Sequence, residues 1–172
     1  MTEFLDSELI FYGITIFLLL FIAAFFSAAE TALTALSRAR IYQLVMDGNR
    51  RAELVSRMRK KKEAMIGAVL LGNNAVNIAA SAIATALTIK IFGSEDGGLL
   101  IVTLIMTLLV VIFTEILPKT YAIQNAEKVA LTFAPILNLL VKLLYPITHT
   151  IQIFIRNLLR LFGVDVTPRE WI

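Results

Sequence analysis

The sequence predicts an all-α integral membrane protein with three transmembrane helices and a cytoplasmic juxtamembrane helical belt. Hydrophobic residues make up 58% of its 172 residues, above the roughly 45–50% that is typical of soluble domains. Three long apolar segments lie in the first two thirds of the chain, and a strongly basic loop separates the first two. These features favour one membrane domain over an ordinary soluble domain.

The first two apolar segments are each long enough to span a membrane. Leu9–Ala29 is an uncharged run of 21 residues and Ala64–Ile89 one of 26, and a spanning helix needs about 20. The first helix should continue beyond Ala29, because ETALTALSRARI keeps good helix formers. The acidic start MTEFLDSELIF lacks the basic region of a signal peptide, so this span should be retained. The second segment is rich in small residues, which let helices approach closely, and we expect it to be central.

The third segment contains a carboxylate. Gly97–Thr114 is uncharged over 18 residues and becomes long enough to span only if Glu115 lies inside it. Pro118 should kink or end this helix. An ionisable group at membrane depth is costly and usually faces a protein interior or a water-filled path. Glu115 is therefore the strongest candidate for a functional residue.

Charge distribution predicts the orientation. Nine of the sixteen basic residues lie between Arg38 and Lys62, whereas the loop GSEDGG after the second segment holds Glu95 and Asp96 and no base. The positive-inside rule places the basic loop in the cytoplasm and the N-terminus outside. A basic run also suits nucleic-acid binding, but its two flanking spans make topology the better explanation. The loop should form helices that break at Asp47-Gly48-Asn49.

The C-terminal third predicts the belt. Val129–Val141 and Leu143–Ile155 are uncharged runs of thirteen residues each, which is short for a span. Polar residues recur among Leu and Ile, as in helices that lie along a membrane interface. A fourth span would carry Arg156 and Arg160 outside, against the charge rule. The membrane domain should therefore comprise residues 1–163, and residues 164–172 (VDVTPREWI) should begin a linker.

Polar residues on the three spans fall at similar depth. Ser27 lies eleven residues before Arg38, Asn73 eleven after Lys62, and Glu115 twelve before Glu127, which at helical rise is roughly 16–18 Å from a charged cytoplasmic residue. Asn73 and Asn77 share a helix face, whereas Asn74 points about 100° away. Carboxylate, amide and hydroxyl oxygens suit Mg²⁺, Ca²⁺ or Na⁺, and the absence of Cys and of paired His argues against Zn²⁺ or Cu²⁺.

Structural roles compete with this interpretation. Asparagines often hold membrane helices together, and a membrane serine such as Ser27 usually bonds the carbonyl four residues before it. Glu115 could pair with Lys119, and Glu30 with Arg38. A serine protease is disfavoured because Ser27 and the single histidine, His149, lack a catalytic context. The coincident depths favour an ion site for Ser27, Asn73 and Glu115, whereas for Glu30 the structural pairing is favoured over ligation.

Three motifs carry a family resemblance. FFSAAETALTALSRARI, GNNAVNIAASA and FTEILPKTYA together resemble the transmembrane domain of the CNNM/CorC family of magnesium transporters. The resemblance implies three membrane helices with a juxtamembrane belt, a homodimer embedded in membrane lipid, and a cytosolic CBS-pair module that binds ATP in the full-length protein. It implies no enzymatic activity and no nucleic-acid partner.

The resemblance also implies a set of site residues. Ser27, Asn73 and Glu115 occupy the positions of Mg²⁺ ligands, Asn77 supports them, and Gly72 allows close approach of the helices. Relatives often place a second serine four residues before the first, where this chain has Ala23. A backbone carbonyl or water would then replace the missing hydroxyl.

The function implied is magnesium export coupled to Na⁺ entry, with Mg²⁺ as the transported substrate and a prokaryotic plasma membrane as the location. Two alternatives remain open at this stage. One is a passive channel for divalent cations, and the other is a membrane anchor or sensor for a cytosolic regulatory module.

Overall fold

The computed structural model describes residues 2–92 and 98–162, and every described element is a helix. Most of the loop GSEDGG and the expected linker at residues 164–172 lie outside the described residues. The elements in chain order are α1 (Thr2–Ala35), α2 (Arg38–Met46), α3 (Arg50–Lys60), α4 (Lys62–Phe92), α5 (Gly98–Leu109), the π-helix η1 (Val110–Ile116), α6 (Leu117–Gln124) and α7 (Ala126–Leu161).

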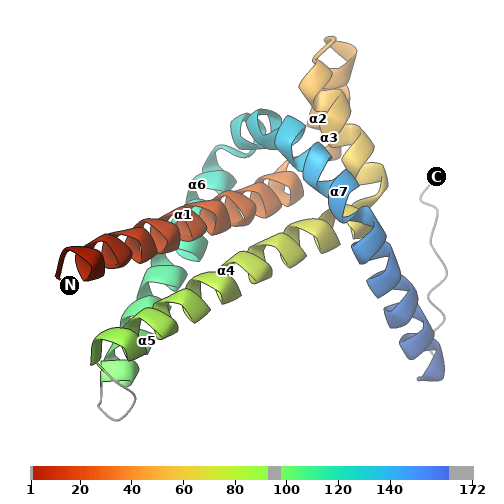
Figure 1. Cartoon of the computed structure of the whole chain (residues 1–172). Helices are drawn as coiled ribbons and strands as arrows, with labels where there is room; N and C mark the ends of the chain where they lie inside the picture. Colours follow the sequence, from red (N-terminus) through yellow and green to blue (C-terminus); the bar gives the residue numbers. More distant parts are fainter. Residues whose placement is uncertain (1, 93–97, 163–172) are drawn as a thin grey trace.

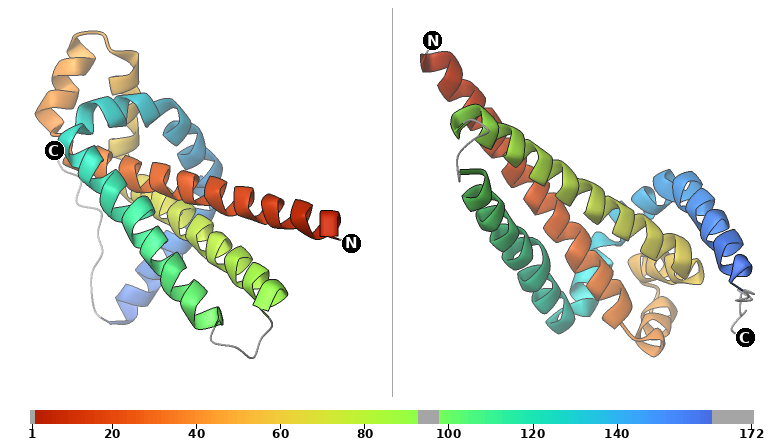
Figure 2. Two further views of the ribbon diagram at one scale, coloured as in Figure 1. Left: turned by 90° about the vertical axis from the view of Figure 1, so that its left-hand side faces the viewer. Right: turned by 90° about the horizontal axis from the view of Figure 1, so that it is seen from below.

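Helix α1 lies at the centre of the membrane bundle. It packs against α4 on one side and against η1 and α6 on the other, and it also contacts α7. Figure 2 shows α1 between α4 and the continuous rod formed by α5, η1 and α6. The expectation that the second span would be central was therefore wrong. The first span carries the small residues Ala23, Ala28, Ala29 and Ala32, all buried, and these allow two neighbours to approach it closely.

Within the part of the chain that the structure describes, four helical segments are long and apolar enough to cross a membrane: Glu8–Ala35, Lys62–Ile91, Leu100–Gln124 and Ala126–Leu161. The first three correspond to the three expected spans. Helix α1 continues past Ala29 to Ala35, as the sequence predicts. The third span does not end at Pro118, because the chain passes from η1 directly into α6 and stays helical to Gln124.

The fourth segment, α7, has an unexpected length. The two runs of thirteen residues join into one helix of 36 residues, with Pro135 and Pro146 inside it. Pro135 and Pro146 leave the carbonyls of Leu131 and Lys142, four residues before each, without their backbone donors, and membrane helices tolerate such prolines where neighbouring groups satisfy the freed carbonyls. Figure 1 shows α7 crossing the end of the bundle and then diverging from α4. Its buried residues Ala130, Ala134, Leu137 and Val141 form one stripe against the bundle.

The basic loop forms the helical hairpin α2–α3, and its break is where the sequence predicts it. Gly48 has φ of 79°, a conformation that costs glycine little. Asn49 then caps α3 by accepting hydrogen bonds from the amides of Arg51 at 3.0 Å and Ala52 at 3.2 Å. This pattern of glycine followed by a capping asparagine ends one helix and begins the next.

Two arginines tie the hairpin to the rest of the chain. Arg59 donates from Nη1 to the carbonyl oxygen of Leu36 at 2.7 Å, at the end of α1. Burial lowers the pKa of Arg59, and the nearby charge of Arg38 lowers it further. Arg40 on α2 binds Glu127 at the start of α7 through two hydrogen bonds of 2.7 and 3.2 Å. The hairpin therefore contacts the C-terminal end of α1 and the N-terminal end of α7.

Candidate functional site

The site begins with a close contact between α1 and α4. A Cβ atom on Gly72 would lie 2.6 Å from Cζ of Phe26, so only glycine fits this position without movement. Phe26 is itself buried. Because Ser27 follows Phe26 and Asn73 follows Gly72, this contact brings Ser27 and Asn73 to the same level of the two helices, within about one helical turn.

Three oxygens near this contact are buried without hydrogen-bond partners. They are Oγ of Ser27, Oδ1 of Asn73 and Oδ1 of Asn77, and none has a partner among the described residues. Ser27 is fully buried and Asn73 is 6% exposed. Asn74, by contrast, is exposed, as expected from its rotation away from Asn73. Leaving a buried polar group unpaired costs about 1–3 kcal/mol, which makes these three oxygens candidates for binding a ligand.

Ser27 departs from the usual behaviour of hydroxyls in membrane helices. Thr88 and Thr114 each donate to the carbonyl four residues before them, at 2.7 and 2.8 Å, as such residues generally do. Ser27 makes no such bond to Ala23. The structural alternative for Ser27 is therefore contradicted, and its oxygen is free to accept or to coordinate.

A π-helix carries Glu115. In η1 the amide of Leu117 bonds the carbonyl of Ile112, five residues back, whereas an α-helix would use the residue four back. The physical cause is Pro118, which has no N–H to donate to the carbonyl of Thr114. Widening of the helix ahead of the proline alters which side chains face inward. π-Bulges of this kind often occur at functional sites, and η1 packs directly on α1.

Glu115 itself is partly buried and unpaired. No hydrogen bond or ion pair to its carboxylate occurs within residues 8–91 and 100–162, and Lys119 one turn later does not reach it. Thr114, the preceding residue, is fully buried. Glu30 likewise makes no ion pair with Arg38 or with any other described base. The pairing alternatives for both acids therefore find no support in the structure.

Sequence reasoning missed the π-helix and the role of Phe26. The signal for the first was present, since a proline three residues after an intramembrane acid disrupts the hydrogen bonds around that acid. Nothing in the spacing indicated which side chain would meet Gly72. Within the described residues no group of three His, Cys, Asp or Glu side chains gathers as a metal site. Any cation bound here would be coordinated by one carboxylate and by neutral oxygens.

The fold and this polar interior define an all-helical integral membrane domain. Comparison with known proteins is more specific, because residues 14–170 match the family described as the Cyclin M transmembrane N-terminal domain, CNNM. The chain belongs to this family, as its three motifs predict.

Relatives occur in bacteria and plants. The chain is 36% identical to a UPF0053 protein of Haemophilus influenzae over 92% of its length. It is 38% identical to the UPF0053 inner membrane protein YfjD of Escherichia coli over 83% of its length. A chloroplastic DUF21 domain-containing protein of Arabidopsis thaliana is 30% identical over 93%. The chain spans 38%, 33% and 24% of these relatives' own lengths.

Proposed function

We propose that this domain transports Mg²⁺, exporting it in exchange for entering Na⁺, and that it binds Mg²⁺ between α1, α4 and η1. The observation that carries the proposal is the set of three buried, unpaired oxygens on Ser27, Asn73 and Asn77. A cation between α1 and α4 would give these oxygens the partners that they lack among the described residues. Family membership supports a transport role for the domain.

The ligand set suits a hard cation that must be released. Mg²⁺ requires six oxygen ligands, loses its water reluctantly and usually keeps several water molecules. Ser27 and Asn73 supply neutral oxygens at one level, Asn77 supports them from the same face of α4, and Glu115 supplies the negative charge. Gly72 keeps α1 and α4 close enough for both to contribute. One carboxylate leaves the ion undercompensated, which favours release over tight storage.

Transport requires that the site open to each side in turn. Pro118 and the π-helix leave α5, η1 and α6 with weaker internal hydrogen bonding beside Glu115 than a regular helix would have. The rod is thus able to bend at the level of the site. When the rod bends in one direction and then in the other, the carboxylate of Glu115 is exposed first to the cytoplasm and then to the outside. Na⁺, which accepts the same amide and hydroxyl oxygens, resets the empty site.

The proposed topology has three spans, formed by α1, α4 and the α5–η1–α6 rod, with α7 as a cytoplasmic belt. The basic hairpin α2–α3 lies in the cytoplasm, so the N-terminus is outside and the C-terminus inside. The E. coli relative is named an inner membrane protein, which supports a prokaryotic plasma membrane. The relatives are about two and a half times as long as this chain, which leaves room for a CBS-pair module in proteins of that length, and we expect the domain to act as a homodimer.

Flux measurements on the full-length protein test this function. Reconstituted in liposomes loaded with a Mg²⁺ indicator, it should move Mg²⁺ only when a Na⁺ gradient is imposed, and Glu115→Gln should abolish the flux. Flux that is independent of Na⁺ would replace this account with a passive divalent-cation channel. Absence of protein-dependent Mg²⁺ flux in both the wild type and Glu115→Gln would favour a membrane anchor or sensor.

A further inference from the structure

The C-terminal half of α7 has two opposite faces. Large apolar residues recur every three or four positions on one face and are exposed: Leu143, Ile147, Ile151, Phe154, Leu158 and Leu161. The opposite face carries Tyr145, His149, Gln152, Arg156 and Arg160 at the same spacing. We call this second set the polar stripe. A helix with two such faces lies in the plane of a membrane interface, with its apolar face among the acyl chains.

The polar stripe meets the corner between α3 and α4. Nζ of Lys61 lies 5.1 Å from the centroid of the Tyr145 ring, within the range of a cation–π interaction. The Tyr145 ring stacks on His149 with centroids 5.5 Å apart and an interplanar angle of 13°. Thr148, beside them on α7, packs against Gly67 of α4. Lys61 of the α3–α4 corner thus contacts the polar stripe at Tyr145, and Arg156 and Arg160 follow on the same stripe about 16–22 Å further along α7.

This surface is cationic, and Glu63, the acid that follows Lys61 and Lys62 in the sequence, forms no ion pair in the described ranges. After Glu127, α7 contains no Asp or Glu but has Lys128, Lys142, Arg156 and Arg160. Lys61, Lys62, Arg156 and Arg160 form no ion pair with any residue in the described ranges. The amide nitrogen Nε2 of Gln152, on the polar stripe, is buried and has no acceptor there. Unpaired donors and cations at a membrane interface call for an acceptor that carries negative charge.

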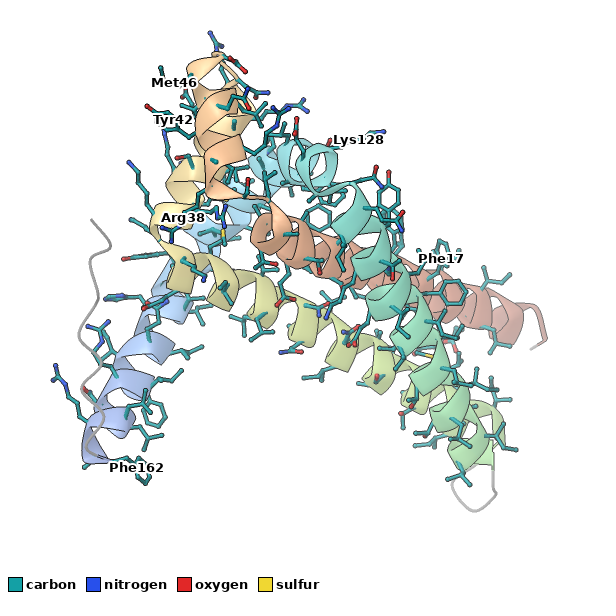
Figure 3. The ribbon with its side chains drawn as sticks, turned by 180° about the vertical axis from the view of Figure 1, so that it is seen from behind. Phe17, Arg38, Tyr42, Met46, Lys128 and Phe162 are labelled. Carbon is teal, nitrogen blue, oxygen red and sulfur yellow. The ribbon has the colours of Figure 1, made fainter. Side chains whose placement is uncertain are left out.

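We propose that the α3–α4 corner and the polar stripe of α7 bind the phosphate of anionic phospholipid headgroups. Phosphate accepts hydrogen bonds from lysine and arginine side chains and carries the negative charge that these bases lack. Because Arg156 lies eleven residues beyond Tyr145 on α7, about 16 Å along the helix, Lys61 and Arg156 bind the phosphates of different lipid molecules. The neighbouring apolar face holds the acyl chains of the same leaflet. Figure 3 shows this half of α7 projecting away from the bundle towards Phe162, where lipid can reach it. The site is separate from the proposed ion site.

Lipid binding by the whole chain in detergent tests the proposal without involving Mg²⁺. Native mass spectrometry titrated with phosphatidylglycerol or phosphatidylcholine should show clear preference for the anionic lipid. The paired substitutions Lys61→Gln and Arg156→Gln should weaken phosphatidylglycerol binding about 25-fold, since each base near an anionic surface contributes roughly fivefold. Arg51→Gln with Lys128→Gln removes the same charge elsewhere and should change binding less than about twofold. Lys128 lies at the opposite end of α7 from Phe162 (Figure 3).

Three outcomes would contradict the proposed lipid site. Equal weakening by the two charge-matched pairs would reduce the effect to net charge, and equal binding of both lipids would exclude an anionic preference. If inorganic phosphate at millimolar concentration displaces phosphatidylglycerol, the surface binds a soluble phosphate and the lipid assignment is wrong. The charge-preserving pair Lys61→Arg and Arg156→Lys should bind as wild type does. If the protein with Lys61→Gln and Arg156→Gln does not fold, two other measurements test the site. They are phosphatidylglycerol binding by the Lys61→Arg and Arg156→Lys protein and the loss of wild-type binding at high salt.

Discussion

The ring of Phe26 on α1 occupies the space that a side chain on Gly72 of α4 would fill. A Cβ there would lie 2.6 Å from Cζ and 2.7 Å from Cε1 of Phe26. This contact sets the separation of the two helices that carry Ser27 and Asn73. The geometry of the proposed ion site therefore depends on a glycine that does not itself supply a ligand side chain.

Substituting Gly72 should damage both packing and binding. In Gly72→Ala the added methyl group must displace Phe26, which is buried, and such overpacking costs about 1–3 kcal/mol. The helices should separate and Mg²⁺ binding should weaken, which calorimetry and thermal unfolding would measure. Gly67→Ala is the matched control on the same helix, because its Cβ would lie 3.5 Å from Cγ2 of Thr148, an ordinary contact.

A second substitution separates the contact from other effects of alanine. Phe26→Leu shortens the side chain that collides, so Gly72→Ala combined with Phe26→Leu should recover much of the lost binding. If Gly67→Ala is as harmful as Gly72→Ala, or if Gly72→Ala binds Mg²⁺ normally, the close contact does not set the site.

Removing Pro118 should restore a regular helix and impair the site. In Pro118→Ala the new amide can donate to the carbonyl of Thr114, so the π-helix loses its cause. Glu115 would then rotate relative to α1, and we expect Mg²⁺ affinity to fall at least about tenfold, or roughly 1.4 kcal/mol, while thermal stability stays equal or rises. Pro146→Ala, a substitution inside α7, is the control and should leave affinity unchanged. Normal binding by Pro118→Ala would show that the π-helix is not required.

Adding the hydroxyl that this chain lacks should tighten binding. Ala23 is fully buried and lies four residues before Ser27, on the same face of α1. Ala23→Ser offers one more oxygen to a bound cation, and a gain of about 1 kcal/mol would raise affinity about fivefold. Ala24→Ser, rotated away by about 100°, should have little effect. An Ala23→Ser protein that folds but binds no more tightly would place position 23 outside the coordination sphere.

The cap of α3 offers a test of how the α2–α3 hairpin is stabilised. Asn49 accepts hydrogen bonds from two amides in the first turn of α3, and loss of such a cap costs about 1 kcal/mol. In Asn49→Ala, hydrogen exchange of the first-turn amides of α3 should therefore accelerate about fivefold. Amides in the middle of α4 serve as an internal control. Unchanged exchange in α3 would mean that tertiary contacts, such as that of Arg59 with Leu36, hold the helix without its cap.

Sequence reasoning succeeded where local patterns act alone. Uncharged length predicts α1 and α4, and the residues Asp47, Gly48 and Asn49 predict the break between α2 and α3 because turn and cap chemistry is local. The same reasoning placed Asn73 inward and Asn74 outward, since helical rotation between neighbours is fixed.

Sequence reasoning failed where tertiary packing determines the arrangement of the helices. The central position of α1 depends on which helix has close neighbours on two sides, and hydropathy does not encode that choice. The length of α7 was missed because Lys142 divides its apolar sequence into two runs of thirteen residues, each short for a span, whereas one helix runs through Lys142 and both prolines. The unpaired state of Ser27 could not be foreseen either, because a hydroxyl in a helix ordinarily bonds its own backbone.

Mg²⁺ binding to the purified chain, with and without the carboxylate of Glu115, tests the central claim most directly. Calorimetry should give saturable binding for the wild type and for the remote control Glu53→Gln on α3. It should give no measurable binding for Glu115→Gln, whose side chain keeps the shape and loses the charge. Thermal unfolding should show that all three proteins are folded. Undiminished Mg²⁺ binding by a folded Glu115→Gln protein would contradict an ion site between α1, α4 and η1.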